Sequence, residues 1–236
     1  MHPVPTIAET LAQQGYVIVR QFLDQAELRQ LRQACQPIEN EYGVRQVLLN
    51  YPAIAKALPS HKLQRLLQTL AMPDAQQVRS LFFNKNAAHN WLVPWHQDMS
   101  ICLKHKSDAP GFHKWTFKHG VHHVEAPAAI LEAMTTLRIA LDDANVDNGA
   151  LKVLTASHLH GKLDSQQIAQ YASSITVTCC ELQAGDLLLM KPLLLHASDK
   201  AQHASGRRVL HMEFSVASLP AQMQWAEADI NATHSL

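Results

Sequence analysis

Short apolar runs follow one another through the chain from Pro73 onward. Each run has the length of a strand, and turn-forming residues such as Asn148-Gly149 separate neighbouring runs. This texture predicts a series of short strands. The runs lie at residues 78–83, 99–103, 135–141, 150–154, 175–180, 186–190, 193–196 and 207–216.

Before Pro73 the pattern is different. Residues 16–20 (YVIVR) predict one further strand, and Asp24 then suits the N-cap of a helix. Apolar residues recur at helical spacing in two stretches that predict helices on the outside of the fold. The first stretch carries Leu28, Leu31 and Ala34, and the second carries Leu63, Leu66, Leu67 and Leu70.

Eight strands of this kind suit a double-stranded β-helix, the jelly-roll architecture of cupin-like proteins. We therefore expect a mainly β (α+β) fold with flanking N-terminal helices. The chain has 236 residues and no linker, repeat or low-complexity tract. A single domain over residues 1–236, with its core at about residues 15–216, is the expected organisation.

Composition narrows the range of partners. Twenty basic residues against 20 acidic ones leave no net charge to attract nucleic acid or a membrane surface. No window approaches the roughly 20 apolar residues of a membrane span, and residues 1–22 do not resemble a signal peptide. The four cysteines show no CxxC spacing and predict reduced thiols. We expect a cytoplasmic protein that acts on a small molecule, with its oligomeric state left open.

The sequence WHQD places His96 and Asp98 two residues apart at the entry to a predicted strand. In an extended chain such residues project from the same face and can converge on one ion. His196 ends an apolar run, where a buried imidazole needs a hydrogen bond or a metal. Two histidines and one carboxylate leave open positions on an octahedral ion, as non-haem iron(II) oxygenases require. Each feature alone is equally compatible with an ordinary structural residue.

Arg207 follows His196 by eleven residues, which allows the two to lie on neighbouring antiparallel strands. Strand alternation puts Arg207 and His211 on one face of their run, and Arg208 on the other, more apolar face. A pocket-facing guanidinium can grip the distal carboxylate of 2-oxoglutarate in a bidentate manner. Ser198 is a candidate hydroxyl donor to the same cosubstrate.

The segment at 104–125 is polar, aromatic and rich in histidine, and it shows no sustained periodicity. We expect a long loop that contributes to substrate selection. Tryptophans near the HxD motif are further candidates for the substrate mouth, although large rings are more often packed in a core. The candidate substrate contacts are Trp91, Trp95, Trp115, His122 and His123, with at most one of the two histidines facing the site.

These motifs together resemble the phytanoyl-CoA dioxygenase family. The similar features are WHQD at 95–98, NGALKVLTASH at 148–158, AGDLLLM at 184–190, and HAS at 196–198 followed by Arg207. The resemblance implies a double-stranded β-helix that uses iron(II) and 2-oxoglutarate. It also implies His96, Asp98 and His196 as metal ligands, with Arg207 and Ser198 as cosubstrate anchors.

The resemblance suggests one further cosubstrate contact, and the sequence departs from the family pattern in two respects. The FFNKN segment suggests that Lys85 or Asn84 touches 2-oxoglutarate. Ala156 stands where the family usually has glycine, and no basic cluster suits the diphosphate of coenzyme A. The family's name-giving substrate is therefore not expected.

The expected activity is a dioxygenase reaction in which dioxygen and 2-oxoglutarate yield succinate, carbon dioxide and a hydroxylated small molecule. Iron-dependent halogenases need a vacant position where Asp98 would bind, so this carboxylate favours hydroxylation. Two alternatives remain at this point: a cupin-like zinc or manganese hydrolase or isomerase, and a jelly roll that binds a small molecule without turnover.

Overall fold

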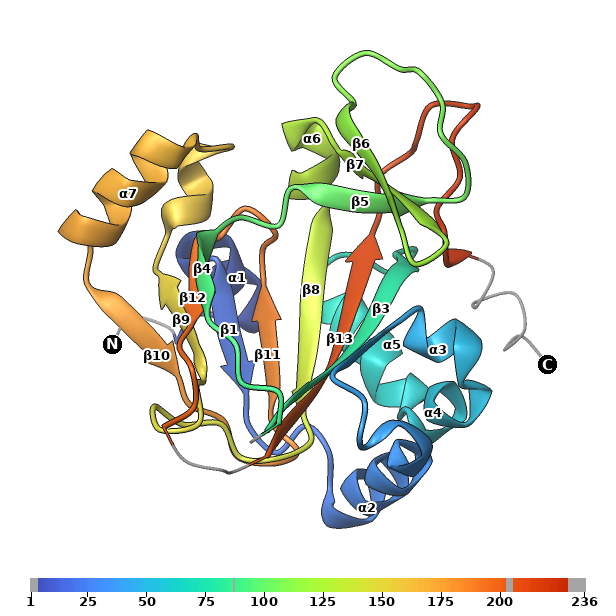
Figure 1. Ribbon diagram of the computed structural model, residues 1–236, viewed down its shortest axis with the longest axis vertical. Coiled ribbons are helices and arrows are strands. Elements are labelled where there is room, and N and C mark those ends of the chain that lie inside the picture. Colours follow the sequence, from blue (N-terminus) through green and yellow to red (C-terminus); the bar gives the residue numbers. More distant parts are fainter. Residues whose placement is uncertain (1–3, 87, 203–205, 229–236) are drawn as a thin grey trace.

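Antiparallel β-sheets lie face to face and form the body of the protein (Figure 1). The computed structural model describes residues 4–86, 88–202 and 206–228. The strands of the large sheet are, in spatial order, β1 (Tyr16–Val19), β11 (Leu187–Met190), β8 (Met134–Ala140), β13 (Arg207–Ser215), β3 (Gln76–Lys85) and β2 (Gly43–Arg45). Those of the small sheet are β10 (Val177–Cys180), β9 (Leu151–Leu154), β12 (His196–Ser198) and β4 (Val93–His96). This arrangement confirms the predicted double-stranded β-helix.

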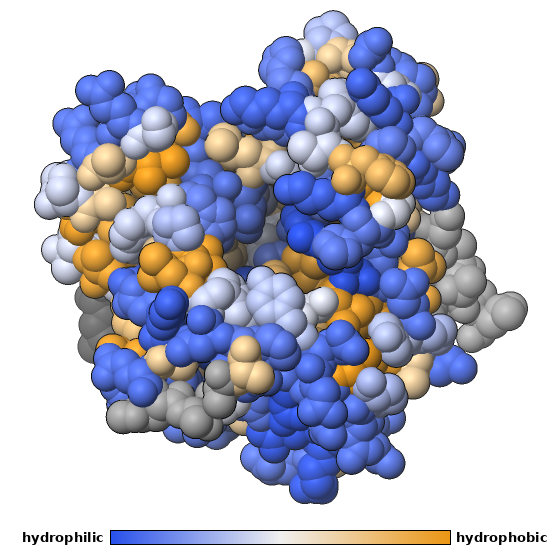
Figure 2. Space-filling view, in the orientation of Figure 1, coloured by the Kyte–Doolittle hydropathy of each residue, from blue (hydrophilic) through white to orange (hydrophobic). Residues whose placement is uncertain are grey.

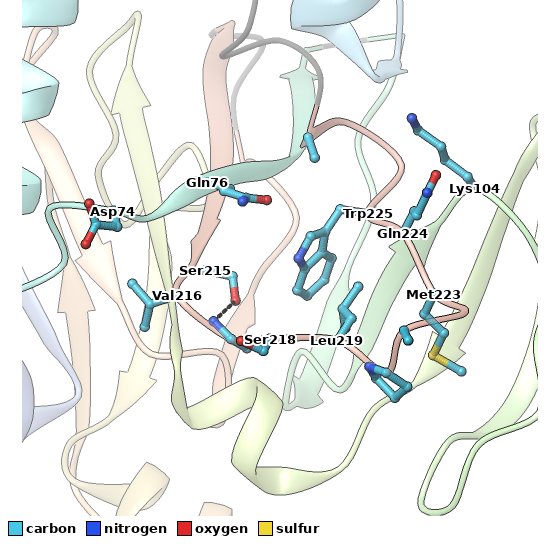
Figure 3. A pocket seen from close by; sticks show the side chains of 14 residues that line it. Asp74, Gln76, Lys104, Ser215, Val216, Ser218, Leu219, Met223, Gln224 and Trp225 are labelled. Carbon is cyan, nitrogen blue, oxygen red and sulfur yellow. Dashed lines mark hydrogen bonds between the residues drawn. The ribbon is translucent and has the colours of Figure 1, made fainter.

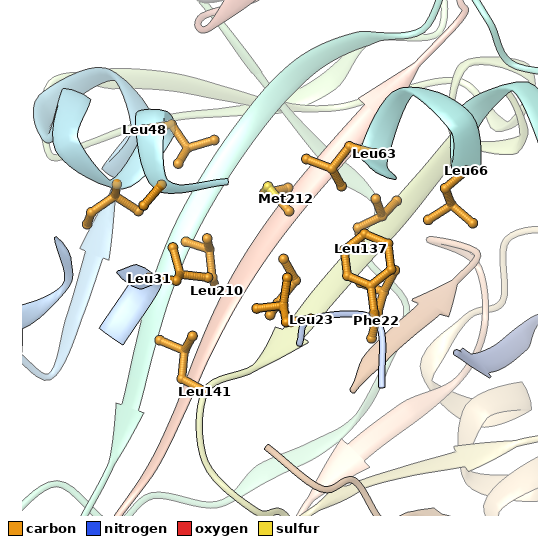
Figure 4. Close-up of a cluster of buried hydrophobic side chains, with 14 of the residues drawn as sticks. Phe22, Leu23, Leu31, Leu48, Leu63, Leu66, Leu137, Leu141, Leu210 and Met212 are labelled. Carbon is orange, nitrogen blue, oxygen red and sulfur yellow. The ribbon is translucent and has the colours of Figure 1, made fainter. Parts of the chain in front are cut away.

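Helices cover the outer face of the large sheet, where Figure 4 shows leucines from helices and strands meeting in one cluster. Leu210 and Met212 project from β13 into this cluster and Leu31 meets them from α2. The helices of this layer are α1 (Ile7–Gln14), α2 (Gln25–Ala34), α3 (Val47–Asn50), α4 (Pro52–Ala57) and α5 (Ser60–Thr69). Helices α6 (Ala128–Glu132) and α7 (Ser165–Ser174) pack on separate apolar clusters, and short 3-10 turns lie at Gln36–Ile38 and Ser157–His160.

Both predicted N-terminal helices are present, as α2 and α5. Asp24 caps α2, since its carboxylate accepts hydrogen bonds from the backbone N–H groups of Ala26 (2.8 Å) and Glu27 (2.9 Å). The strand expected at 16–20 is also present, as β1. The sequence therefore located these two helices and the strand correctly, whereas α1, α3 and α4 were not predicted.

Two strand predictions needed correction. Residues 193–196 do not form a strand: the backbone turns there, with the Leu194 N–H bonded to the Lys191 carbonyl, and β12 begins only at His196. The leucines of this turn are buried, which is why the apolar pattern imitated a strand. Strand β4 was missed because it contains Pro94, but β4 is an edge strand, where proline is tolerated.

The prediction of a long loop at 104–125 was wrong for the second half of this segment. Residues His113–Lys118 (β6) and Val121–Glu125 (β7) form a hairpin that pairs with β5 (Ser100–Leu103) in a side sheet. Most of β6 is exposed, so its polar side chains hide the alternation of a strand. The turn between β6 and β7 has positive φ at His119 (50°) and Gly120 (77°), as a tight hairpin turn requires.

Cys35, Cys102, Cys179 and Cys180 are free cysteines in the structure. Among the residues that the structure describes, no helix is long and apolar enough to cross a membrane.

The cluster between helices and large sheet predicts a clear stability effect. Leu137 of β8 is fully buried there, so Leu137→Ala should lower the free energy of unfolding by about 2–5 kcal/mol through lost burial and a residual cavity. Leu159→Ala, at a side chain that is 64% exposed, is the control and should change it by no more than about 0.5 kcal/mol. Urea denaturation measures both, and equal effects would contradict this account of the core.

Candidate metal centre

Three side chains from the predicted motif converge at the edge of the small sheet. His96 ends β4 and His196 begins β12, and the two residues lie directly opposite each other in the strand pairing. Asp98 follows two residues after His96. One ligand atom from each of the three side chains lies within 4.8 Å of the others. The structure thus brings together the residues that the sequence proposed as metal ligands.

The hydrogen bonds of the two imidazoles fix which nitrogen faces the centre. Nδ1 of His96 lies 2.8 Å from the Pro94 carbonyl, and Nδ1 of His196 lies 2.9 Å from the Leu194 carbonyl. A carbonyl only accepts, so Nδ1 carries the hydrogen in both rings and Nε2 presents its lone pair.

These Nε2 atoms lie 3.7 Å (His96) and 3.5 Å (His196) from the two oxygens of the Asp98 carboxylate. Two lone pairs and an anion that face one another this closely repel unless a cation lies between them. The arrangement, with each second ring nitrogen held by a carbonyl, is the usual environment of metal-binding histidines. The residues present therefore fit a divalent metal ion.

Charge states in the cluster are consistent with this fit. Burial raises the pKa of Asp98, but the surrounding groups, chiefly the two histidines, lower it more, to about 2, so the carboxylate is ionised at neutral pH. Burial lowers the pKa of His196 to about 4, so its ring is neutral. An ionised carboxylate and a neutral imidazole are the forms that bind metal.

Gln97, between the two ligands of the HxD motif, ties the site to its surroundings. Its side-chain amide donates to the carbonyls of Gly161 and Leu193, both at 2.7 Å, and its oxygen accepts from the Leu163 N–H at 2.8 Å. Because Leu193 lies in the turn that leads into His196, this buried amide links the two ligand-bearing segments. Sequence reasoning gave Gln97 no role.

The cluster opens into a cavity of about 230 Å³ between the two sheets. The face of the molecule in Figure 2 is hollowed near its centre. The small sheet and its connections contribute Val93, His96, Asp98, Leu151, His196 and Ser198, and Trp91 lies beside them; the large sheet contributes Arg79, Leu81, Phe83, Arg138, Arg207, His211 and Glu213. A larger hollow of about 630 Å³ lies by the C-terminal segment around Trp225 and contains none of the metal-centre residues (Figure 3).

Arg207 lines the cavity as expected, but the strand arrangement that brings it there differs from the expected one. β12 and β13 are not neighbours: they belong to opposite sheets, so Arg207 faces His196 across the cavity. Its guanidinium is buried, and burial, with the nearby Arg138, lowers the pKa of Arg207 to about 10. Its Nε has no hydrogen-bond partner, and within the described chain no carboxylate pairs with it.

Ser198 also lines the cavity, but its hydroxyl is already engaged. It donates to the Gly149 carbonyl (2.8 Å) and accepts from Nζ of Lys85 (2.8 Å). Lys85 is fully buried, also donates to the Asp199 carbonyl (2.6 Å), and lies 5.2 Å from the centre of the Trp91 ring. Lys85 therefore supports the cavity wall from behind through Ser198.

Asn84 is turned away from the cavity, and its amide donates to the Glu39 carbonyl at 2.5 Å on the helix-covered side of β3. Asn84 therefore does not line this cavity. The reason is strand alternation: Lys85 and Asn84 are neighbours and must face opposite sides of the sheet.

The other proposed substrate contacts do not line the cavity. Trp95 packs on an apolar cluster with Leu195, and Trp115 packs on the cluster beneath the side sheet. His122 lies against Phe117, 4.6 Å between ring centroids, and His123 is buried beside Cys102. These four side chains thus pack within the fold. Of the proposed tryptophans and histidines, only Trp91 borders this cavity.

Arg79, Arg138, His211 and Glu213 are cavity residues that sequence reasoning gave no functional role. Arg138 lies between Leu137 and Ile139, and Glu213 between Met212 and Phe214; a charged residue between two apolar residues of a strand is a usable signal. The alternation that placed Arg207 in the cavity also places His211 and Glu213 there.

A family model for phytanoyl-CoA dioxygenase (PhyH) matches residues 11–209. No curated protein sequence matches the chain significantly. Solved structures share its fold: the non-heme alpha ketoglutarate dependent carbocyclase SnoK from nogalamycin biosynthesis has a TM-score of 0.69 at 16% identity, covering 98% of this chain and 93% of its own. The epimerase SnoN, in complex with Fe3+, alpha ketoglutarate and nogalamycin RO, has a TM-score of 0.68 at 15% identity, covering 92% and 90%.

A third similar structure is EctD from S. alaskensis with 2-oxoglutarate and 5-hydroxyectoine. Its TM-score is 0.68 at 14% identity, and the match covers 88% of this chain and 74% of EctD. At these identities the likeness concerns the fold.

The metal centre generates a direct test. His196→Ala removes a buried imidazole ligand, so it should weaken iron(II) binding at least about tenfold. His113→Ala, at an exposed position of the side sheet, is the matched control and should bind iron as the unmodified protein does. Anaerobic calorimetric titration with iron(II) measures both. Equal affinities in the two variants would exclude this cluster as the metal site.

Proposed function

Since the chain belongs to the phytanoyl-CoA dioxygenase family, we propose that it is an iron(II)- and 2-oxoglutarate-dependent enzyme that hydroxylates a small molecule. Oxygenase chemistry with iron and 2-oxoglutarate on a small molecule follows from the family and agrees with the expectation from the sequence.

The observation that carries the proposal is the orientation of His96, Asp98 and His196 toward one point. A facial set of two imidazoles and one carboxylate leaves adjacent positions on iron for 2-oxoglutarate and dioxygen. Bound iron supplies the dioxygen chemistry that converts 2-oxoglutarate to succinate and carbon dioxide. The residues of the chain fix the geometry and line a site between two sheets.

Asp98 supports hydroxylation over halogenation, because its carboxylate takes the position that a halide needs. Ring closure, as in the name of SnoK, is the outcome against which hydroxylation must be tested. The two differ in the fate of oxygen: a hydroxylated product acquires one atom from dioxygen, whereas ring closure adds none.

Arg207 is the proposed anchor for the distal carboxylate of 2-oxoglutarate. Its guanidinium faces the metal centre from the opposite sheet and lacks a protein carboxylate as partner. A buried cation of this kind is costly unless an anion reaches it, and a planar carboxylate matches its fork of N–H donors. Ser198, held by Lys85, lines the same cavity.

The first test separates this enzyme from a zinc or manganese hydrolase and from a binding module. Anaerobic addition of iron(II) and 2-oxoglutarate should produce a weak visible charge-transfer band, which only an iron–2-oxoglutarate complex gives. Admission of air should then release succinate slowly even without substrate. Asp98→Ala should abolish succinate release, and undiminished release would refute the proposed ligand set. Once a substrate is identified, labelled dioxygen distinguishes hydroxylation from ring closure.

The second test concerns the anchor. Arg207→Gln should raise the Kd for 2-oxoglutarate at least about tenfold, because the variant lacks the charge-assisted bidentate contact. Arg208→Gln is the matched control: the neighbouring guanidinium pairs with Asp142 (2.8 Å) outside the cavity, so the Kd should stay within about twofold. Titration of the charge-transfer band measures both, and equal shifts would contradict the assigned role.

A further inference from the structure

Arg138 of β8 is held in the cavity wall by a chain of hydrogen bonds. Its guanidinium lies 2.8 Å from Nδ1 of His211, and Nε2 of His211 lies 3.1 Å from Glu213. Glu213 in turn pairs with Arg79 at 3.0 Å. Phe83 lies beneath the guanidinium of Arg138, 5.7 Å from its ring centroid.

The donors in this chain can be assigned. A guanidinium only donates, so Nδ1 of His211 accepts from Arg138 and Nε2–H of His211 donates to Glu213. Burial lowers the pKa of His211, which agrees with the neutral ring that this pattern demands. His211 therefore orients Arg138 without neutralising it.

Charges in the cavity do not balance. Its walls carry the guanidiniums of Arg79, Arg138 and Arg207 against the carboxylates of Asp98 and Glu213. Directly behind the wall, the buried ammonium of Lys85 bonds to Ser198 and a backbone carbonyl and adds a further positive charge. Glu213 neutralises Arg79 by direct pairing. Arg138 has no carboxylate within ion-pair distance among the described residues.

The proposed cofactors do not remove this excess. A ferrous ion adds two positive charges and the 2-oxoglutarate dianion removes two, so the excess of positive charge is unchanged. Asp98 is the other cavity carboxylate, and the metal takes it. Lys85 lies behind the wall, where Ser198 and the Asp199 carbonyl engage it. With Arg207 engaged by 2-oxoglutarate, Arg138 is the cavity-lining cation that lacks a counter-charge.

We infer that the substrate is a small carboxylate whose carboxylate group is bound by Arg138. This inference rests on the proposed function. A half-buried guanidinium with fixed orientation is suited to a planar anion, and a carboxylate would reduce the excess of positive charge.

The polarity and volume of the rest of the cavity constrain the part of the substrate that Arg138 does not bind. Leu81, Phe83, Trp91, Val93 and Leu151 are the apolar lining residues, so the part that carries the oxidised C–H group is hydrocarbon. About 230 Å³ is below the roughly 300 Å³ at the lower end of ordinary ligand sites, and 2-oxoglutarate takes part of it. A small acid fits this space, whereas most of a coenzyme A thioester would lie outside.

The test uses the anaerobic protein loaded with iron(II) and saturating 2-oxoglutarate. Straight-chain carboxylates from acetate to octanoate, and phenylacetate, are titrated alongside their uncharged amides. We expect at least one carboxylate to shift the charge-transfer band saturably, with affinity at least tenfold above that of its amide. A shift of the band, rather than its loss, shows that the probe binds beside 2-oxoglutarate and does not displace it.

Arg138→Gln should abolish this preference, so that carboxylate and amide bind alike, while the Kd for 2-oxoglutarate stays within about threefold. Arg138→Lys keeps the charge and should retain part of the preference. Arg208→Gln, outside the cavity, should behave as the unmodified protein. Thermal unfolding of each variant checks that a lost preference does not reflect a lost fold.

Two results would overturn the inference. One is an unmodified protein that binds no carboxylate of the series better than its amide. The other is an Arg138→Gln variant whose Kd for 2-oxoglutarate rises as much as that of Arg207→Gln, since Arg138 would then serve the cosubstrate. Failure of the proposed function is distinct, because the unmodified protein would then show no charge-transfer band at all.

Discussion

The pairing of β4 with β12 is the constraint on which the site depends. It sets His96 directly opposite His196, although 99 residues separate them in the chain. The same backbone supplies the carbonyls that turn both Nε2 atoms toward Asp98. Gln97 then ties the HxD segment to the turn before His196. A shift of this pairing by one residue would direct one imidazole to the opposite face of the sheet and dismantle the centre.

The large sheet serves two purposes through alternation along β13. Leu210 and Met212 face the helices and contribute to the main apolar cluster, whereas Arg207, His211 and Glu213 face the cavity. Stability and chemistry are thereby assigned to opposite faces of one strand. The helix-covered face supplies the burial that allows the other face to hold charged groups whose desolvation is unfavourable.

Much of this organisation was accessible from sequence, because it depends on local periodicity. Period-two alternation placed Arg207 in the cavity and Arg208 outside it, and the HxD spacing identified His96 and Asp98. The errors arose where a longer-range partner decides the outcome. The apolar turn before His196 is buried by contacts that no local pattern reveals, and the exposed β6 is a strand only because β7 pairs with it. Sequence spacing also suggested adjacent strands for His196 and Arg207, whereas chain topology places them on opposite sheets.

The three cavity arginines differ in how their charge is compensated, and this difference separates structural from ligand-directed roles. Arg79 has a carboxylate partner within the protein, Glu213, so its charge is satisfied before any ligand arrives. Arg207 and Arg138 have none among the described residues, and Arg138 is oriented by a neutral histidine instead of an acid. A fold selected for stability alone would pair or replace such groups, since removing an unpaired cation from water, wholly at Arg207 and partly at Arg138, is destabilising. Their presence is explained if the counter-charges come from solution, and binding of those anions then also stabilises the folded protein.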